Sequence, residues 1–250
     1  MNINFAQLEI AGETNCGTVR TRNEDNFIIF APENGSAVLA AVADGIGGHS
    51  HGEVASHICC KTLLQAARSV NSASWTKEFL FETLQSANER IFNYNFADRR
   101  IKPMGCTVAA AIFFRDRVIT ASAGDSRIYE YLKVSGRAPL KQLTVDHRPE
   151  NFRKLRLDPR FSKISLISRS LGTNKFLKLD IAEFPRDKAA KYLICSDGLY
   201  GSLNDLVLAG ILGDANSMRS KTSSLVRGAI VAGEHDNITV ICAGTAEREG

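Results

Sequence analysis

The sequence predicts a mixed fold of the α+β class, in which β-strands and helices form one domain over residues 1–250. Three observations predict it. Apolar runs of strand length recur along the chain and stop at glycine or at polar turns. Two long segments, 53–68 and 75–97, instead carry apolar residues at helical spacing. No linker rich in proline, glycine or serine divides the 250 residues, and a hydrophobic content of 44% is sufficient for a sizeable core.

The strands are predicted from short apolar runs bounded by turn-forming residues. Asn34-Gly35 is a hairpin signal, which joins the second predicted strand to the third. The predicted strands cover 7–14, 27–30, 37–43, 106–114, 118–123, 128–132, 140–145, 165–171, 177–184, 191–195 and 238–241.

The helices are predicted where apolar residues recur every three or four positions. Segments 53–68 and 75–97 each have one apolar face, which suits them to cover a sheet. Ser202 and Asp205 resemble a capping box and predict the start of a third helix. The last two predicted helices run from this box through Leu212 and over about 217–232.

Composition and charge argue against several classes of protein. The first 13 residues lack the basic and apolar segments of a secretory signal, and no apolar run approaches the roughly 20 residues of a membrane span. We therefore expect a cytoplasmic protein without a membrane partner. The net charge of +4 is too small to indicate nucleic-acid binding by itself.

The cysteines and histidines do not form a recognisable metal or disulfide pattern. The six cysteines contain no C-x-x-C pair and mostly lie in apolar segments, so we interpret them as reduced core residues. His49, His51 and His57 lie close together in the sequence, but no partner stands at a familiar zinc spacing.

The segment Asp44-Gly45-Ile46-Gly47-Gly48 is the first candidate site. An apolar strand delivers one carboxylate to a glycine-rich turn, and the glycine allows a backbone carbonyl to approach the same ligand. Adjacent oxygen ligands suit a hard cation such as Mg²⁺ or Mn²⁺. Taken alone, the segment is equally compatible with an ordinary turn after a strand.

Other acids repeat this construction. Asp125, Asp197 and Asp236 each stand at the edge of a predicted strand, and Glu24-Asp25 precedes another. If the strands stack into one sandwich, these carboxylates meet at one edge and need cations to offset their repulsion. The pattern indicates a hydrolytic site with several metal ions.

Arg20 precedes this acidic pair and offers a planar fork that matches phosphate oxygens. The alternative is a solvated turn with a local ion pair.

Taken together and in this order, these motifs resemble the metal-dependent PP2C (PPM) protein phosphatases, in particular the bacterial type. The resemblance covers about 12–243. It rests on Arg20-x-x-x-Glu24-Asp25-Asn26, Ala43-Asp44-Gly45-Ile46-Gly47-Gly48-His49, Gly105-Cys106-Thr107, Ala123-Gly124-Asp125-Ser126-Arg127, Ser170-Leu171-Gly172, Ser196-Asp197-Gly198-Leu199 and Asp236-Asn237-Ile238-Thr239.

The resemblance implies a four-layer α/β/β/α sandwich of two antiparallel sheets flanked by helix pairs. It also implies a site at one end of the sheets that binds two Mn²⁺ or Mg²⁺ ions. In this family pattern Asp44 bridges both ions, Gly45 gives its carbonyl to one, and Asp197 and Asp236 hold the other. By position, Asp125 together with Asp197 would bind a third ion. Glu24 and Asp25 would contact the metals through water, and Arg20 would clamp the phosphate.

The implied activity is hydrolysis of phosphoserine and phosphothreonine in proteins, the substrates of a Ser/Thr kinase, by a monomeric enzyme. Two nearby cations lower the pKa of a bridging water, and the resulting hydroxide attacks phosphorus in line. Alternatives are a catalytically silent PP2C-like protein that binds phosphoproteins, and a nuclease or other two-metal hydrolase on another fold.

Two departures from the family pattern concern substrate and proton donor. Ile46 occupies the position of a histidine proposed as general acid in many eukaryotic relatives, which leaves His49 or a metal-bound water as the donor. The flap region 148–163 is unusually basic, and this charge predicts a preference for acidic or multiply phosphorylated segments.

Overall fold

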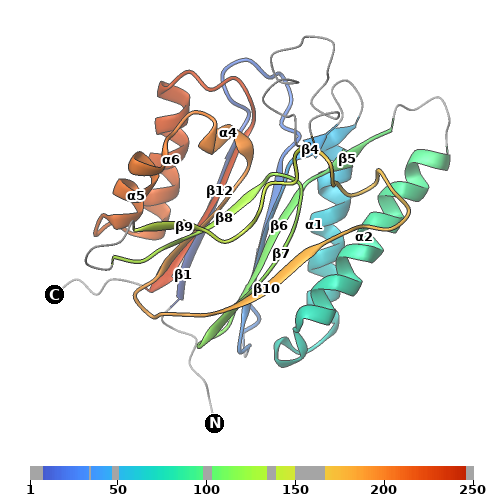
Figure 1. Ribbon diagram of the computed structural model, residues 1–250, viewed down its shortest axis with the longest axis horizontal. Helices are drawn as coiled ribbons and strands as arrows, with labels where there is room; N and C mark the ends of the chain where they lie inside the picture. The colour runs from blue at the N-terminus through green and yellow to red at the C-terminus, as the bar shows by residue number, and fades with distance from the viewer. Residues whose placement is uncertain are drawn as a thin grey trace.

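Two antiparallel sheets of five strands pack face to face, and helices cover the outer face of each sheet (Figure 1). The computed structural model describes residues 8–33, 35–46, 51–97, 103–133, 139–149 and 167–245. The first sheet has the order β1 (Leu8–Asn15), β12 (Ile238–Thr245), β11 (Lys191–Cys195), β8 (Arg127–Tyr131) and β9 (Leu140–Gln142). The second has the order β10 (Asp180–Pro185), β7 (Arg117–Ala123), β6 (Val108–Phe113), β3 (Val38–Ala43) and β2 (Asn26–Phe30).

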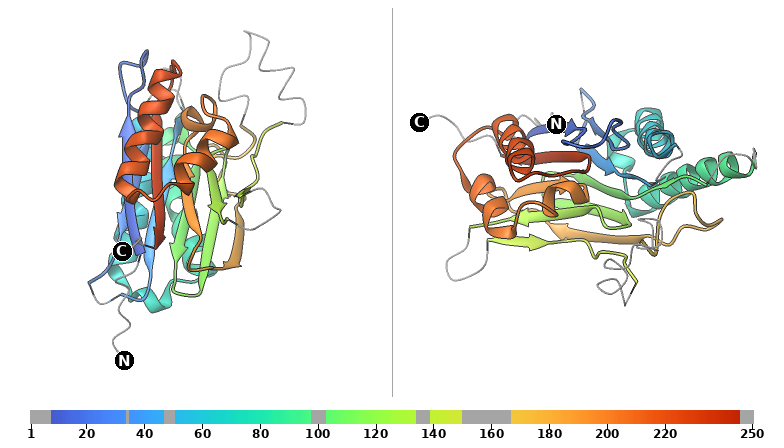
Figure 2. Two further views of the ribbon diagram at one scale, coloured as in Figure 1. Left: turned by 90° about the vertical axis from the view of Figure 1, so that its left-hand side faces the viewer. Right: turned by 90° about the horizontal axis from the view of Figure 1, so that it is seen from above.

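The helices lie on opposite sides of the paired sheets, as Figure 2 shows from two further directions. They are α1 (Gly52–Ser69), η1 (Ser72–Ser74), α2 (Lys77–Ala97), α4 (Asp197–Tyr200), α5 (Asp205–Gly213) and α6 (Met218–Val231). Among the described helices, none has the combination of length and apolar character needed to cross a membrane. A short ladder of β4 (Gly45–Ile46) and β5 (Gly105–Cys106) completes the structure beside α1.

Three layers of apolar side chains explain why the central strands read as continuous apolar runs. In β3, Leu39 and Ala41 pack toward α1 and α2, whereas Ala40 and Val42 pack between the two sheets. Successive side chains point to opposite faces of a strand, so a strand covered on both faces needs apolar residues at every position. A third cluster lies between the first sheet and helices α4 to α6. The predicted four-layer sandwich is therefore confirmed.

The long helices and most strands agree with the sequence prediction, but several strands do not. The strand expected over 106–114 divides at Thr107 into β5 and β6, which belong to different sheets. The strand expected over 140–145 ends at Gln142, and the one expected over 177–184 begins only at Asp180. The strand expected over 165–171 is wrong in its described part, 167–171, which makes a single bridge from Leu171 to Cys106. Residues 165 and 166 of that strand and Asn34 of the predicted hairpin turn lie outside the described residues.

The predicted capping box at Ser202 and Asp205 is also wrong. The N-cap of α5 is Asn204, whose side chain accepts hydrogen bonds from the backbone N–H groups of Leu206 and Val207. Ser202 instead donates to the carbonyls of Gly198 and Leu199, within the preceding turn. All six cysteines are free, and five of them are buried.

Antiparallel pairing brings the predicted acidic positions to the same end of the two sheets. The first residue of β2, Asn26, pairs with the last of β3, Ala43, so Asp25 and Asp44 are neighbours in the second sheet. In the first sheet, Cys195 at the end of β11 pairs with Val240 near the start of β12. Asp197 and Asp236 are therefore presented at corresponding strand ends.

Candidate active site

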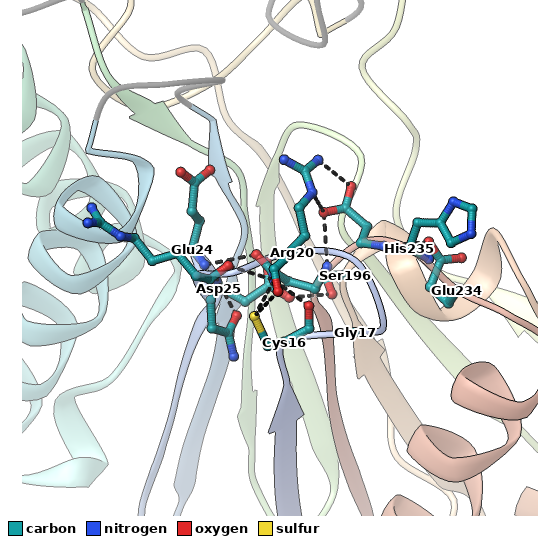
Figure 3. Close-up of polar contacts among 12 residues, drawn as sticks. Cys16, Gly17, Arg20, Glu24, Asp25, Ser196, Glu234 and His235 are labelled. Atoms are coloured by element: carbon teal, nitrogen blue, oxygen red, sulfur yellow. Dashed lines mark hydrogen bonds and ion pairs between the residues drawn. The ribbon is translucent and has the colours of Figure 1, made fainter.

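Hydrogen bonds from two buried polar residues connect the two sheets at this end. Asn237 accepts from the backbone N–H of Glu24 at 2.8 Å and donates to the carbonyls of Cys16 at 3.0 Å and Arg22 at 3.1 Å. Ser196 donates to Asp25 Oδ2 at 2.7 Å (Figure 3). These bonds fix the loop between β1 and β2 against the entrances of α4 and β12.

The backbone of Asp44 is held at the end of β3 by two hydrogen bonds to Thr107. Its N–H donates to Thr107 Oγ1 at 3.1 Å, and its carbonyl accepts from the Thr107 N–H at 2.8 Å. Only 5% of the residue is exposed. Because β3 is buried on both faces, the Asp44 carboxylate sits at the boundary between an apolar core and the open end of the sandwich.

Gly45 occupies a backbone cradle that no other residue fits. Its N–H donates to the carbonyl of Glu24 at 3.2 Å. A Cβ at this position would lie 2.4 Å from the carbonyl oxygen of Gly52 and 2.6 Å from that of Glu24. The close approach of three backbone segments thus explains the glycine directly after Asp44.

Asp197 is the first residue of α4, which begins just after β11. Strand periodicity does not predict this short helix. The next residue, Gly198, allows α4 to approach the entrance of β12, since a Cβ there would lie 2.2 Å from the Asn237 carbonyl oxygen. Asp197 is thereby carried on a turn packed against the segment that contains Asp236.

Arg20 and Asp236 form an ion pair at the rim. Arg20 Nε lies 3.1 Å from Asp236 Oδ1, and Nη2 donates to Oδ2 at 3.3 Å. The Arg20 side chain is 44% exposed, and Figure 3 shows it extending over the site from the loop after β1. The two-pronged contact with a carboxylate is the geometry by which a guanidinium also binds phosphate.

Asp125 belongs to a neighbouring group of side chains that includes Arg148 and Tyr200. Arg148 donates to Asp125 Oδ2 from both Nε, at 3.2 Å, and Nη2, at 3.0 Å. Tyr200 donates to the Asp125 carbonyl at 2.8 Å. Burial, together with the charges of Asp125 and Asp197, raises the pKa of Tyr200 well above its usual value, so the phenol stays protonated.

Arg127 and Asp146 form a second charged pair beside this group. Two hydrogen bonds of 2.9 and 2.8 Å join the guanidinium to the two carboxylate oxygens. Burial acts to raise the pKa of Asp146, but the bond from Arg127 and the charges of Arg127 and Arg148 outweigh it and lower that pKa. Asp146 is therefore a stable anion that orients both arginines.

His147 fixes the first residues of the segment predicted as a flap. Its Nδ1 accepts from the Gly124 N–H at 3.1 Å, which places the proton of the neutral ring on Nε2, 2.8 Å from Asp180 Oδ2. Of the predicted flap over 148–163, only residues 148 and 149 are described. Gly47, Gly48 and His49 of the glycine-rich turn likewise lie outside the described residues, whereas Ile46 is buried in β4.

The donor set consists of carboxylate and carbonyl oxygens, which fits a hard divalent cation. The Gly45 cradle supports this fit because it brings the Asp44 strand end against the Glu24 loop. Within the described ranges, however, no three His, Cys, Asp or Glu side chains converge as a metal-holding group. Asp125 and Asp236 are instead engaged by arginines.

Three of the buried cysteines do not fit the role of a nucleophile. Burial is the main cause that raises the pKa values of Cys60, Cys106 and Cys195, and the charges of neighbouring cysteines and acids act in the same direction. Their thiols therefore remain protonated and enclosed in the core.

Sequence reasoning missed several residues that organise the site, chiefly Thr107, Arg148, Ser196, Tyr200 and Asn237. A signal was present for two of them. Ser196 and Asn237 are polar residues next to a predicted acidic position, at strand ends that are otherwise apolar. The partners of Arg148 could not be read from the chain, since Asp125 and Tyr200 are 23 and 52 residues away.

Comparisons with known proteins agree with this architecture. A family model described as protein phosphatase 2C matches residues 14–223. The serine/threonine phosphatase stp of Listeria monocytogenes serotype 4b is 30% identical over 237 residues, covering 91% of this chain and 92% of that protein. Protein phosphatase PhpP of Streptococcus pneumoniae is 27% identical over 255 residues, covering 97% and 99%.

Among solved structures, the catalytic domain of the serine threonine protein phosphatase PstP, in complex with two manganese ions, superimposes with a TM-score of 0.79. It is 27% identical, and the match covers 96% of this chain and 99% of that one. PppA of Pseudomonas aeruginosa gives the same TM-score at 28% identity, with 96% and 98% covered. The chain belongs to the protein phosphatase 2C family.

Proposed function

We propose that this protein is a metal-dependent serine/threonine protein phosphatase that hydrolyses phosphoserine and phosphothreonine in proteins phosphorylated by a Ser/Thr kinase. The observation that carries the proposal is the strand-end arrangement of Asp44-Gly45, Asp25 and Asp236 with Arg20 at the rim. It combines oxygen donors for cations with one guanidinium suited to phosphate. Family membership independently supports a phosphoprotein phosphatase.

The metal ligands follow from the family pattern. Asp44 would bridge two divalent cations, with the Gly45 carbonyl on one and Asp197 and Asp236 on the other. Glu24 and Asp25 would act through water, and Asp125 would join Asp197 at a further ion. Such cations polarise a phosphate ester and lower the pKa of bound water. We propose Mn²⁺ or Mg²⁺, and manganese is named for the relative PstP.

The chain's own groups bind and orient the substrate. Arg20 would exchange its partner Asp236 for two phosphate oxygens, since the same fork serves both anions. Asp25 and Glu24 remain in place during that exchange because Ser196 and Asn237 hold them by separate hydrogen bonds. The phosphate would thus be aligned without movement of the strand ends.

Several finer expectations accompany the proposal. The protein would act as one domain over 1–250, as a monomer, in the cytoplasm. The silent phosphoprotein-binding alternative is not favoured, because the relatives are named phosphatases and none of the matched acidic positions is lost.

Phosphate release from a phosphothreonine peptide tests the proposal. With Mn²⁺ we expect turnover that EDTA stops and that Asp197→Asn abolishes without loss of the fold. Asp205→Asn is the matched control, because it makes the same charge change at an exposed position in the first turn of α5. Full activity in Asp197→Asn would contradict the assignment of the site.

The basic segment at 148–163 carries a second test, of substrate choice. Reversal of the charges at Arg153, Lys154 and Arg156, which lie outside the described residues, is expected to lower kcat/KM for acidic phosphopeptides. A small aryl phosphate, which carries no acidic flanking residues, should lose less. Equal losses on the two substrates would remove the idea.

A further inference from the structure

Asp125 shares with Asp236 an arginine partner, but the partner of Asp125 is the less exposed one: 19% of the Arg148 side chain is exposed, against 44% for Arg20. Only 4% of Asp125 is exposed, so its charge has little access to water. Both Nε and Nη2 of Arg148 donate to Oδ2, at 3.2 and 3.0 Å. The family pattern assigns this carboxylate to a third cation, whereas the structure places a guanidinium on it.

Tyr200 closes this contact into a ring. Arg148 Nη2 also donates to the Tyr200 hydroxyl at 2.8 Å, and that hydroxyl donates to the Asp125 carbonyl at 2.8 Å. Tyr200 ends the same short helix, α4, that Asp197 begins. The ring therefore links Asp125 to the helix that carries its expected co-ligand.

A second layer of charges holds Arg148 in this orientation. Asp146 Oδ2 lies 3.7 Å from Arg148 Nε and is bound more closely by Arg127. The Arg127 guanidinium in turn lies 3.6 Å from the centroid of the Tyr200 ring, a cation–π contact. The two carboxylates and two guanidiniums balance in charge, which is the condition under which buried ionic groups are tolerated.

We propose that Arg148 is a resident positive charge that takes the place of a third metal ion at Asp125. The inference rests on the proposed function and deepens it, because it limits the wild-type site to two divalent cations. A cation approaching Asp125 must displace two hydrogen bonds from Arg148 and is repelled by its charge. Removal of the guanidinium exposes a carboxylate that lacks this counter-charge, so the affinity for a cation rises.

The direct test is the number of Mn²⁺ ions bound per chain, measured by electron paramagnetic resonance of the free ion during titration. Wild type is expected to bind two. Arg148→Ala is expected to bind a third, at least about 10-fold more tightly than any third ion on wild type, as expected for removal of one adjacent positive charge. The double variant Arg148→Ala with Asp125→Asn should lose it again.

The matched control is Arg117→Ala, which removes the same charge at the far end of β7. It should leave two bound ions. Thermal unfolding gives a second readout, since Mn²⁺ should raise the Tm of Arg148→Ala more than that of wild type or of the control.

The outcomes separate this inference from the proposed function. A wild-type chain that binds three ions and loses one in Asp125→Asn would overturn the inference and leave the phosphatase intact. So would an Arg148→Ala variant that folds but gains neither an ion nor an added Tm response. A wild-type chain that binds no Mn²⁺ would overturn the proposed function itself.

Discussion

The hydroxyl of Ser196 makes two buried hydrogen bonds that join the candidate site to the first sheet, so Ser196→Ala is an informative perturbation. The hydroxyl donates to Asp25 Oδ2 at 2.7 Å and accepts from the Thr239 N–H at 3.0 Å. Ser196 is completely buried, and alanine fits the same space with one atom fewer. The variant therefore removes polar contacts with little change in packing.

The expected loss in the free energy of unfolding of Ser196→Ala follows from the two lost hydrogen bonds. A hydrogen bond to a charged group contributes about 1.5–3 kcal/mol, and a buried backbone N–H left without its acceptor costs about 1–3 kcal/mol. Allowing for partial relaxation, we expect the free energy of unfolding to fall by about 3 kcal/mol. For a chain of this size each kcal/mol lowers Tm by about 2–4 °C, so Tm should fall by about 6–12 °C.

Urea unfolding followed by circular dichroism measures this change. Ser202→Ala is the control, because its hydroxyl is only partly buried and donates to helix carbonyls that have a second lone pair. We expect a loss below about 1 kcal/mol there. A Ser196→Ala variant that loses no more than the control would refute the claim that this hydroxyl joins the site to the sheet.

Three further predictions follow from single contacts. Arg20→Ala should lower kcat/KM for p-nitrophenyl phosphate by about 100-fold through loss of a charged donor, and an unchanged kcat/KM would exclude a phosphate contact. Gly45→Ala should destabilise the fold by about 2 kcal/mol in urea unfolding because its Cβ would overlap two carbonyl oxygens. Gly210→Ala, where no atom lies within 4 Å of the added Cβ, should stabilise α5 by up to about 1 kcal/mol, and equal effects at both glycines would contradict the cradle. The pKa of Asp146 is lower in the folded protein than the ordinary carboxyl value of 3.8, so its ionised carboxylate stabilises the fold above that pH. This stabilisation is lost as pH falls through the lower pKa of the folded state. The stability difference between wild type and Asp146→Asn should thus be constant above about pH 5 and shrink below about pH 4, and a difference that persists to pH 2 would refute this origin.

The sandwich was predictable because its central strands are covered on both faces and so are apolar at every position. Strand β3 and the β6–β7 pair show this clearly, and the helical spacing in α1 and α2 marks their buried faces. Edge elements carry a weaker pattern. Strand β10 contains only exposed and half-buried residues, and the prediction placed its start three residues too early.

The acidic positions of the site were predictable for a different reason. A carboxylate interrupts apolar sequence at Asp44 and Asp197, and a glycine follows each one where a backbone segment approaches closely. Their partners were not predictable. The bonds of Ser196 to Asp25 and of Asn237 to Glu24 span 171 and 213 residues, and no local propensity encodes such pairings.

Arg148 illustrates the limit most clearly. In the sequence it is one of several basic residues, which indicates a solvated loop or a general attraction for acidic substrates. In the structure its guanidinium is directed to Asp125 by Tyr200, 52 residues away, and by Asp146 of its own segment. Its role depends on tertiary packing and on charge balance, neither of which a residue pattern records.

Hydrolysis of p-nitrophenyl phosphate by the purified protein, titrated with Mn²⁺ and stripped with EDTA, shows whether the acidic strand ends form a metal-dependent phosphatase site. We expect turnover that depends on the metal and disappears in Asp44→Asn, while circular dichroism shows that the variant keeps its fold. Absence of turnover at every Mn²⁺ concentration, despite measurable Mn²⁺ binding, would contradict this expectation. So would an Asp44→Asn variant with wild-type activity.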